Sequence, residues 1–228
     1  MYKIVKKEIL NPSVVLMDVY APDIARSCES GQFIVLRIDE FGERIPLTIA
    51  DYFPEEGTIR IVTQAVGYTS RKLMNMNQGD SFIDFIGPLG KESEIENYGT
   101  VLCICGGLGI APMFPIARDL KKAGNKVITV MGARNKDLLI WEDVLKTVSD
   151  EVYVTTDDGS YGRKGLVTDV AKEILEREKV DKAWAIGPVI MMKFSSLLTE
   201  KYHVPTIVSM NPIMVDGTGM CGACRLEV

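Results

Sequence analysis

Short stretches rich in Val, Ile and Phe, separated by turn residues, fill the first hundred positions of the chain. They lie at Lys3–Glu8, Ser13–Val19, Gln32–Ile38, Thr58–Thr63 and Ser81–Ile86. Asn-Pro, Gly-Gln, Glu-Gly and Gly-Asp pairs mark the turns between them. Regularly spaced short strands of this kind predict a small antiparallel barrel. A helical turn over Gly67–Met74, with Thr69 or Ser70 as the N-cap, is expected to interrupt the strands.

After Gly87-Pro88-Leu89-Gly90 the hydrophobic pattern changes to an alternation of strand and helix. Strands are expected at Val101–Cys105, Lys126–Met131, Val152–Thr156, Lys182–Ile186 and Thr206–Ser209. Helical spacing is found at Met113–Ala123, Glu142–Thr147, Val167–Arg177 and Ile190–Lys201. This alternation predicts a doubly wound parallel sheet. The charged stretch near residues 91–99 is the expected boundary, which gives domains at 1–97 and 98–210 and a tail at 211–228.

Composition narrows the class of protein. The chain has 228 residues, of which 46% are hydrophobic and 25% charged, as in ordinary globular proteins. A net charge of -5 argues against a nucleic-acid partner held by phosphate contacts. Lysines interrupt Met1–Leu10, and glycines and prolines break the apolar stretch Val101–Ala117, so neither a signal peptide nor a membrane span is expected. A cytoplasmic location follows as the expectation.

The five cysteines divide into three groups. Cys103 and Cys105 lie in an apolar strand and are interpreted as small buried hydrophobic residues. Cys28 is expected to be a surface or boundary thiol without an assigned role. Cys221 and Cys224 are the pair with the spacing of metal ligands. His203 is the single histidine, which argues against a zinc site and against a nucleophile activated by histidine.

A glycine-rich turn, Gly106-Gly107-Leu108-Gly109-Ile110-Ala111-Pro112, follows a buried strand and opens a helix. Glycines allow a sharp turn and a close approach to a pyrophosphate, whose charge the N-terminus of the helix favours. This context predicts a dinucleotide site. Arg134 follows the next strand and could lie near the adenosine ribose. An acidic ribose ligand is absent from that strand end, so the choice between NAD and NADP is left open.

A second candidate motif is Arg44-Ile45-Pro46-Leu47-Thr48 in the predicted barrel. The arginine can hold an anionic group and the threonine hydroxyl a polar ring edge, with proline stiffening the segment between them. An arginine in an ordinary strand loop is the alternative. The helical turn at Gly67, Thr69 and Ser70 offers a further phosphate cradle in the same domain, and this favours the functional interpretation.

The arginine motif, Gly-x-Thr-Ser, the glycine turn and Gly187-Pro188 before Met191-Met192 together resemble the ferredoxin–NADP reductase superfamily. The resemblance implies a flavin-binding barrel followed by a nicotinamide-binding domain, with hydride passing between FAD and NAD(H) at the cleft between them. It also assigns the site residues. FAD would be held by Arg44, Pro46, Leu47, Thr48, Gly67, Thr69 and Ser70, with Thr48 beside the reactive nitrogen as the catalytic residue. The nicotinamide dinucleotide would contact Gly106, Gly107, Gly109, Ala111, Pro112, Arg134, Gly187 and Pro188. Many members have a cysteine where this chain has Ile186.

The tail from Asn211 to Cys224 resembles, more narrowly, the small (alpha) subunits of NADH-dependent reduced ferredoxin:NADP oxidoreductases, the electron-bifurcating transhydrogenases. This implies a larger flavin and iron–sulfur partner subunit, with ferredoxin reached indirectly. It also implies that Asp216, Cys221 and Cys224 are ligands of a [2Fe–2S] cluster. The remaining cysteine would follow downstream, so an intact cluster is expected in the complete protein and not in this chain.

Other interpretations stay open. Cys221 and Cys224 also have the spacing of a dithiol exchange site, although the four residues after them are short for the helix such sites use. A zinc knuckle would need two further ligands. The same fold and cofactors occur in electron-transfer subunits of dihydroorotate dehydrogenase, where a cysteine would be expected in place of Asp216. A non-catalytic module that binds nucleotide without flavin is an alternative of another class.

Overall fold

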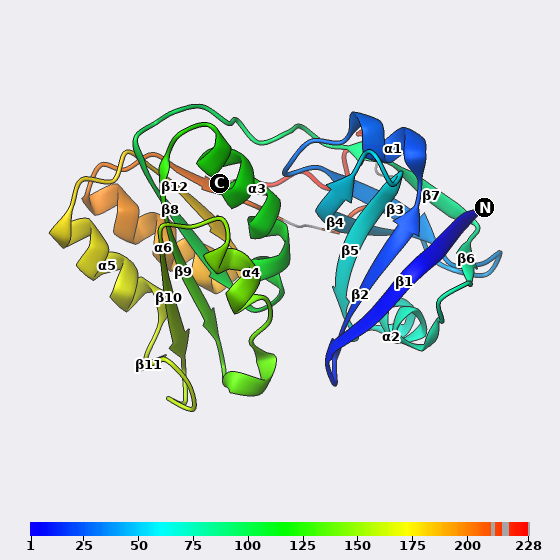
Figure 1. Ribbon diagram of the computed structural model, residues 1–228, viewed down its shortest axis with the longest axis horizontal. Helices are drawn as coiled ribbons and strands as arrows, with labels where there is room; N and C mark the ends of the chain where they lie inside the picture. Colours follow the sequence, from blue (N-terminus) through cyan, green and yellow to red (C-terminus); the bar gives the residue numbers. More distant parts are fainter. Residues whose placement is uncertain (211–212, 216–218, 228) are drawn as a thin grey trace. The chain divides into compact units, whose positions relative to one another are not determined.

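The computed structural model describes residues 1–210, 213–215 and 219–227, and the chain divides into two compact units (Figure 1). Unit 1 comprises residues 1–93 together with the described residues of the tail, and unit 2 comprises residues 94–210. Each unit has its own hydrophobic core.

Unit 1 is a nearly closed antiparallel barrel of seven strands. The strands are β1 (Tyr2–Asn11), β2 (Val14–Tyr20), β3 (Phe33–Arg37), β4 (Ile45–Phe53), β5 (Thr58–Gln64), β6 (Ser81–Phe82) and β7 (Asp84–Leu89). Their order is β6-β1-β2-β5-β4-β3-β7. The two edge strands are separated by Ile83 alone, so one short segment pairs with β1 at its start and with β3 further on. This segment brings the ends of the sheet together and confirms the predicted barrel.

Alternate residues of the barrel strands fill its interior. Phe82 and Phe85 from the closing segment are almost fully buried, and their ring centroids lie 5.9 Å apart. Ile34 and Leu36 of β3 belong to the same cluster. Burying a large apolar side chain of this kind contributes roughly 1.5–3 kcal/mol. The core therefore fixes which residues of each strand face outward.

Strand β4 was not expected from the sequence, and Pro46 removes a backbone donor near its start. The strand tolerates this proline because its first residues pair only with β3, and pairing with β5 begins at Ile49. The short helix α1 (Pro22–Ser27) was also not expected.

Two further expectations for unit 1 need correction. Cys28 is 4% exposed and lies in the barrel core, because α1 packs its apolar side against the barrel and carries the next residue inward. Helix α2 (Tyr68–Asn75) has Gly67 as its N-cap, where Thr69 or Ser70 was expected. The hydroxyl group of Ser70 instead accepts the backbone N–H of Gly67 from the third position of the helix.

Unit 2 is a six-stranded parallel sheet in the order β11-β10-β9-β8-β12-β13. The strands are β8 (Thr100–Gly106), β9 (Lys126–Ala133), β10 (Glu151–Thr156), β11 (Arg163–Lys164), β12 (Lys182–Ile186) and β13 (Thr206–Val208). The α-helices are α3 (Ile110–Lys122), α4 (Glu142–Lys146), α5 (Val167–Arg177) and α6 (Val189–Lys201), with 3-10 turns at η1 (Gly107–Gly109) and η2 (Lys136–Leu138).

The connections of unit 2 explain why the helices lie on both faces of the sheet. From β8 the chain proceeds to β9 and β10, then returns to the other side of β8 as β12 and β13. Right-handed crossovers in opposite directions place α3 and α4 on one face and α5 and α6 on the other (Figure 1). The predicted doubly wound fold is confirmed.

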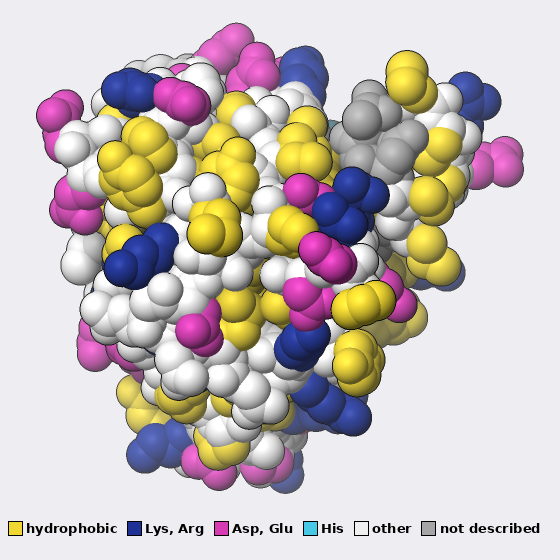
Figure 2. All heavy atoms as spheres, turned by 90° about the vertical axis from the view of Figure 1, so that its right-hand side faces the viewer, with side chains coloured by type: hydrophobic (Ala, Val, Ile, Leu, Met, Phe, Trp, Pro, Cys, Tyr) yellow, Lys and Arg dark blue, Asp and Glu magenta, His cyan; other side chains and the backbone are white. Residues whose placement is uncertain are grey.

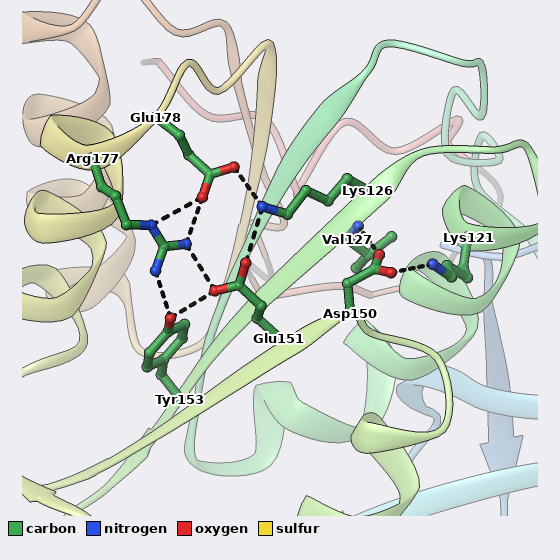
Figure 3. Close-up of polar contacts among 8 residues, drawn as sticks. All are labelled: Lys121, Lys126, Val127, Asp150, Glu151, Tyr153, Arg177 and Glu178. Carbon is green, nitrogen blue, oxygen red and sulfur yellow. Dashed lines mark hydrogen bonds and ion pairs between the residues drawn. The ribbon is translucent and has the colours of Figure 1, made fainter.

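Charged residues tie together the strand starts of unit 2 (Figure 3). Glu151 accepts hydrogen bonds from Tyr153 at 2.6 Å and Arg177 at 2.7 Å, and its other oxygen lies 3.0 Å from Lys126. Glu178 bonds to both Lys126 and Arg177. The hydrogen bond from Tyr153, followed by the contact with Lys126, lowers the pKa of Glu151 to about 2. This network joins β9, β10 and the end of α5 at the sheet edge opposite the glycine turn.

Figure 2 shows the side of the chain that lies to the right in Figure 1. Basic, acidic and hydrophobic side chains lie intermixed there, and the described part of this face has no broad surface of one charge. None of the helices within the described ranges combines the length and apolar character that crossing a membrane requires.

Candidate functional site

The glycine turn of unit 2 lies at the point where the strand order reverses. Gly106 ends β8 and Gly187 follows β12, and these two strands are neighbours in the sheet, with Cys105 paired to Ile186. In open α/β sheets, ligands bind outside the carboxyl ends of the strands at such a switch point. The sequence motifs at 106–112 and 187–188 are thus brought to one place.

Three glycines allow the two turns to meet. A Cβ atom on Gly109 would lie 2.2 Å from the carbonyl oxygen of Ile186, and one on Gly106 would lie 2.6 Å from the sulfur of Met191. A Cβ atom on Gly187 would lie 2.9 Å from the carbonyl oxygen of Gly106. Side chains at these positions would push the turns apart, so these glycines are explained by close packing of the protein with itself.

Gly107 is different, because it faces open space. Its φ is +56°, in the left-handed region that favours glycine, and no heavy atom lies within 4 Å of its ideal Cβ position. Helix α3 starts three residues later, with Ala111 buried against the sheet. Pro112 occupies the third position of α3, where a missing N–H leaves no helical hydrogen bond unmade. The arrangement gives an accessible backbone turn at a helix N-terminus.

Arg134 follows β9 at the same edge of the sheet and is exposed, without an ion pair in the described part of the chain. The loop after β10 is hydrogen-bonded to it: the N–H of Asp157 donates to Ala133 at 3.1 Å, and that of Asp158 to Arg134 at 3.2 Å. Hydrogen bonds from Ser160 lower the pKa of Asp158. Sequence reasoning missed these two exposed acids, although Asp-Asp-Gly directly after an expected strand was the available signal.

Strand β4 of unit 1 separates the residues of the arginine motif onto two faces. Ile45 and Leu47 pack against the barrel core, as does buried Ile49. Because strand side chains alternate, Pro46 and Thr48 project from the outer face. Arg44 lies two residues before Pro46, so the same alternation places it on that face. Leu47 therefore packs against the barrel core beneath the candidate site and does not face it.

The outer face next to β4 continues across β3 and β7. Thr48 pairs with Phe33, and Phe33 pairs with Leu89. In the next row Pro46 pairs with Val35 and Val35 with Ile86, which is 46% exposed. Val35 itself is 2% exposed, so the accessible apolar surface beside Thr48 comes from half-buried Pro46 and from Ile86, and it suits a flat aromatic ring with one polar edge.

A charged cluster follows this apolar surface. Arg44 and Arg37 both contact the carboxylate of Asp84, at 3.3 Å and 2.7 Å respectively. Arg37 and Asp84 were not singled out from the sequence. Their roles depend on pairing between strands that are far apart along the chain, and local motifs carry no signal of it.

The N-terminus of α2 is organised by side chains of the Gly-x-Thr-Ser motif. The Ser70 hydroxyl group accepts the N–H groups of Val66 at 3.0 Å and Gly67 at 2.8 Å. Thr69 is buried and donates to Glu43 at 3.4 Å, which links α2 to the loop before β4. An ideal Cβ atom on Gly67 would meet only the Ser70 oxygen, at 3.9 Å. Space therefore remains beside this helix end.

The candidate metal ligands are described only in part. Cys221 is exposed and Cys224 is half-buried, while Asp216 lies outside the described residues. The described residues contain no group of three or more His, Cys, Asp or Glu side chains that could hold a metal ion. Cys103 and Cys105 cannot complete a set, because both are fully buried in β8 and burial raises the pKa of Cys103 to about 12.

Comparison with known proteins places the chain among oxidoreductase subunits. A family model described as the oxidoreductase NAD-binding domain matches residues 103–196. A relative from Thermotoga maritima, a dihydroorotate dehydrogenase B (NAD(+)) electron transfer subunit homolog, is 52% identical over 99% of this chain and 80% of its own length. The solved structure of an NADH-dependent reduced ferredoxin-NADP oxidoreductase, studied for flavin-based electron bifurcation, is 52% identical. It has a TM-score of 0.93 and covers 99% of this chain and 81% of that chain.

A more distant structure shows how widely the fold is shared. The ferredoxin NADP+ reductase from Neisseria gonorrhoeae, solved with FAD and NADP, has a TM-score of 0.73 at 16% identity, over 92% of this chain and 98% of that chain. This likeness concerns the fold alone. The high identity and coverage of the first two proteins establish the relationship itself. The chain therefore belongs to the family of dihydroorotate dehydrogenase B electron-transfer subunits and their homologues, which are oxidoreductase components built on the fold of ferredoxin–NADP reductase.

Proposed function

We propose that this chain is an FAD-containing electron-transfer subunit that passes electrons between NAD(H) and a larger partner subunit, as in the ferredoxin:NADP transhydrogenases. The observation that carries the proposal is the presence of two candidate binding sites in the same chain. One is the outer face of β4, with Arg44, Pro46 and Thr48; the other is the open glycine turn at Gly107. The relationship to electron-transfer subunits supports it.

The outer face of β4 fits a flavin in three respects. Arg44 is about half exposed and supplies a guanidinium group for the pyrophosphate. Pro46 and Ile86, on either side of buried Val35, would give an apolar support for a ring. Thr48 would direct its hydroxyl group to the reactive edge of that ring. The backbone at Gly67 and the N–H group of Thr69 would complete the phosphate cradle at the N-terminus of α2, where Ser70 holds the turn and the Thr69 hydroxyl group is engaged with Glu43.

The switch point of unit 2 fits a nicotinamide dinucleotide. The backbone at Gly107 is open, and the N-terminus of α3 lies directly behind it. Gly106, Gly109 and Gly187 keep the turns close enough to form the crevice, and Pro188 caps α6 beside it. Arg134 would lie on the adenosine side, at the neighbouring strand end.

When bound, nicotinamide and flavin supply the hydride-transfer chemistry, and flavin can also release single electrons. The residues of the chain bind, orient and exclude water. No general base is needed among them, because hydride transfer does not require one. The larger partner subunit would receive the electrons and reach ferredoxin. A cytoplasmic location stays a prediction from the sequence.

We further propose that Cys221 and Cys224 ligate a [2Fe–2S] cluster, with Asp216 as a third ligand. The described residues supply two thiols of the four ligands that such a cluster requires, so no step of the reaction is assigned to it. Iron and sulfide analysis of the intact complex provides the test. Cys221→Ser and Cys224→Ser variants that retain the full iron content would remove these residues from the ligand set.

A second candidate is the electron-transfer subunit of a dihydroorotate dehydrogenase, since the relative from Thermotoga maritima carries that name. Mass spectrometry of the complex purified from its natural source separates the two candidates. A partner with dihydroorotate dehydrogenase activity would replace the first candidate by the second. A protein that is colourless when purified, and that takes up no FAD on reconstitution, would exclude both and favour a nucleotide-binding regulatory module.

A further inference from the structure

Asp84 is the shared partner of two arginines on the outer face of the barrel. Its carboxylate oxygen Oδ2 accepts a hydrogen bond from Nε of Arg37 at 2.7 Å and from Nη2 of Arg44 at 3.3 Å. The contacts join residues 47 and 40 positions apart in the sequence. One carboxylate therefore fixes two guanidinium groups.

The strand register explains this cluster. Arg37 on β3 is the direct cross-strand partner of Asp84 on β7. Arg44 lies one residue before the pair that Ile45 of β4 makes with Leu36. Strands β3 and β7 and the residue before β4 thus place charged side chains at one level, next to the row in which Pro46 and Ile86 flank buried Val35. Paired strands hold side chains at fixed separations, so the cluster is set by the barrel itself.

Both guanidinium groups keep donors for a ligand. An arginine has five N–H donors, and Asp84 engages the Nε group of Arg37 and one Nη group of Arg44. The Arg44 side chain is 47% exposed, whereas those of Arg37 and Asp84 are 25% and 23% exposed. The carboxylate is thus the half-buried base of the cluster, and Arg44 is its accessible part. Two positive charges against one negative leave an excess of positive charge.

We propose that Asp84 is a positioning residue that holds Arg37 and Arg44 as a pair of guanidinium groups for the FAD pyrophosphate. The inference rests on the proposed function and adds Arg37 and Asp84 to the flavin site. A free arginine loses rotamer freedom when it binds a ligand, and this loss opposes binding. Asp84 lowers that cost by orienting both side chains beforehand, and it offsets the repulsion between them.

A role of Asp84 through its charge alone and a role in positioning the arginines predict opposite changes in FAD affinity when the charge is removed, which makes the proposal testable. A carboxylate near a pyrophosphate repels it, so removing the charge should tighten FAD binding if Asp84 acts through its charge alone. If Asp84 positions the arginines, Asp84→Asn should weaken FAD binding about tenfold, equivalent to about 1.4 kcal/mol. Asp84→Glu should recover most of the affinity, because it restores the charge-assisted hydrogen bonds.

The experiment measures the dissociation constants of FAD and riboflavin for the full chain by quenching of flavin fluorescence. Riboflavin lacks the pyrophosphate, so Asp84→Asn should leave its affinity unchanged, whereas a general loss of structure would weaken both ligands. Asp23→Asn is the matched control, since Asp23 forms an exposed ion pair with Arg26 in the same unit, and both affinities should be retained.

Arg37→Gln provides a second variant if Asp84→Asn fails to fold, and it should lower FAD affinity while sparing riboflavin. FAD binding by Asp84→Asn that equals or exceeds that of the wild type would overturn the inference and leave the proposed function intact. Equal losses for FAD and riboflavin would also overturn it. A wild-type chain that binds no FAD would instead remove the proposed function, and the inference with it.

Discussion

Gly109 lies against the backbone of Ile186, so closely that a Cβ atom on Gly109 would be 2.2 Å from the Ile186 carbonyl oxygen. This contact joins the turn after β8 to the end of β12, the two strands that flank the switch point. The proposed dinucleotide crevice thus depends on a steric relationship that only glycine satisfies. The sequence motif gave no sign of this contact. It was interpreted as allowing the backbone to approach a ligand closely.

Gly109→Ala should therefore destabilise unit 2 and weaken NADH binding. Overpacking of this kind costs about 1–3 kcal/mol, because a backbone carbonyl cannot move aside as a flexible side chain would. Thermal unfolding and an NADH titration of the same sample measure the two effects. Gly67→Ala serves as the stability control, since its Cβ atom would meet only the Ser70 oxygen at 3.9 Å. A Gly109→Ala protein as stable as the control would contradict this interpretation of the contact.

Gly107→Ala should act mainly on the ligand. A left-handed φ costs alanine about 1 kcal/mol, and the added methyl group would enter the space that we assign to the dinucleotide. Gly79→Ala is matched to it, because Gly79 also has positive φ and open space around its Cβ position. Both variants should lose stability, while only Gly107→Ala should raise the dissociation constant of NADH. Equal NADH affinity in the two variants would place the dinucleotide elsewhere.

Thr48→Ala should slow the reduction of flavin by NADH more than it weakens FAD retention. Loss of one hydrogen bond is worth about 0.5–1.5 kcal/mol, which corresponds to a severalfold lower rate. Stopped-flow reduction and FAD occupancy after gel filtration are the measurements, and Thr48→Ser should restore the rate because it restores the hydroxyl group. The reverse pattern, with FAD lost and an unchanged rate in the FAD that remains, would show that Thr48 does not face the reactive part of the ring.

Glu151→Gln should destabilise the chain in a pH-dependent way. The pKa of Glu151 is lowered to about 2 in the folded protein by Tyr153, Lys126 and Arg177, while an unfolded chain has the ordinary value near 4.3. Its stabilising effect is therefore complete above the unfolded pKa and disappears as the pH falls towards 2. At pH 7 the free energy of unfolding of the wild type is expected to exceed that of Glu151→Gln by about 0.5–1 kcal/mol.

Urea unfolding at a series of pH values measures this advantage. Glu173→Gln is the control, because Glu173 makes an exposed ion pair with Arg163 that should contribute little. A difference between wild type and Glu151→Gln that stays constant from pH 7 to pH 3 would show that the network in Figure 3 acts through packing and not through charge.

Local patterns in the sequence were enough for most of the fold. The continuous apolar stretch at Val101–Cys105 and the helical spacing of Val167–Arg177 predicted the parallel sheet, because a buried strand is apolar throughout and an amphipathic helix repeats its apolar residues at the helical period. Strand β4 was missed. Its Pro46 is unusual for a central strand, and the observed pairing shows that β5 joins β4 only from Ile49 onward.

The candidate site was less accessible to sequence reasoning. Arg44 and Thr48 were found through a motif, as was the glycine turn at Gly107. Asp84 and Arg37 become neighbours only when β7 and β3 pair, and no short motif records that register. The burial of Cys28 likewise depends on how α1 packs on the barrel. Long-range pairing is thus the part of the structure that local patterns do not specify.

Electron transfer between NAD(H) and flavin can be followed by anaerobic titration of the FAD-reconstituted chain with NADH. We expect the visible flavin absorbance to be lost in proportion to the NADH added, and Gly107→Ala to require higher NADH concentrations for the same loss. Flavin that is bound stoichiometrically yet stays oxidised under excess NADH would contradict electron transfer between NAD(H) and flavin in this chain.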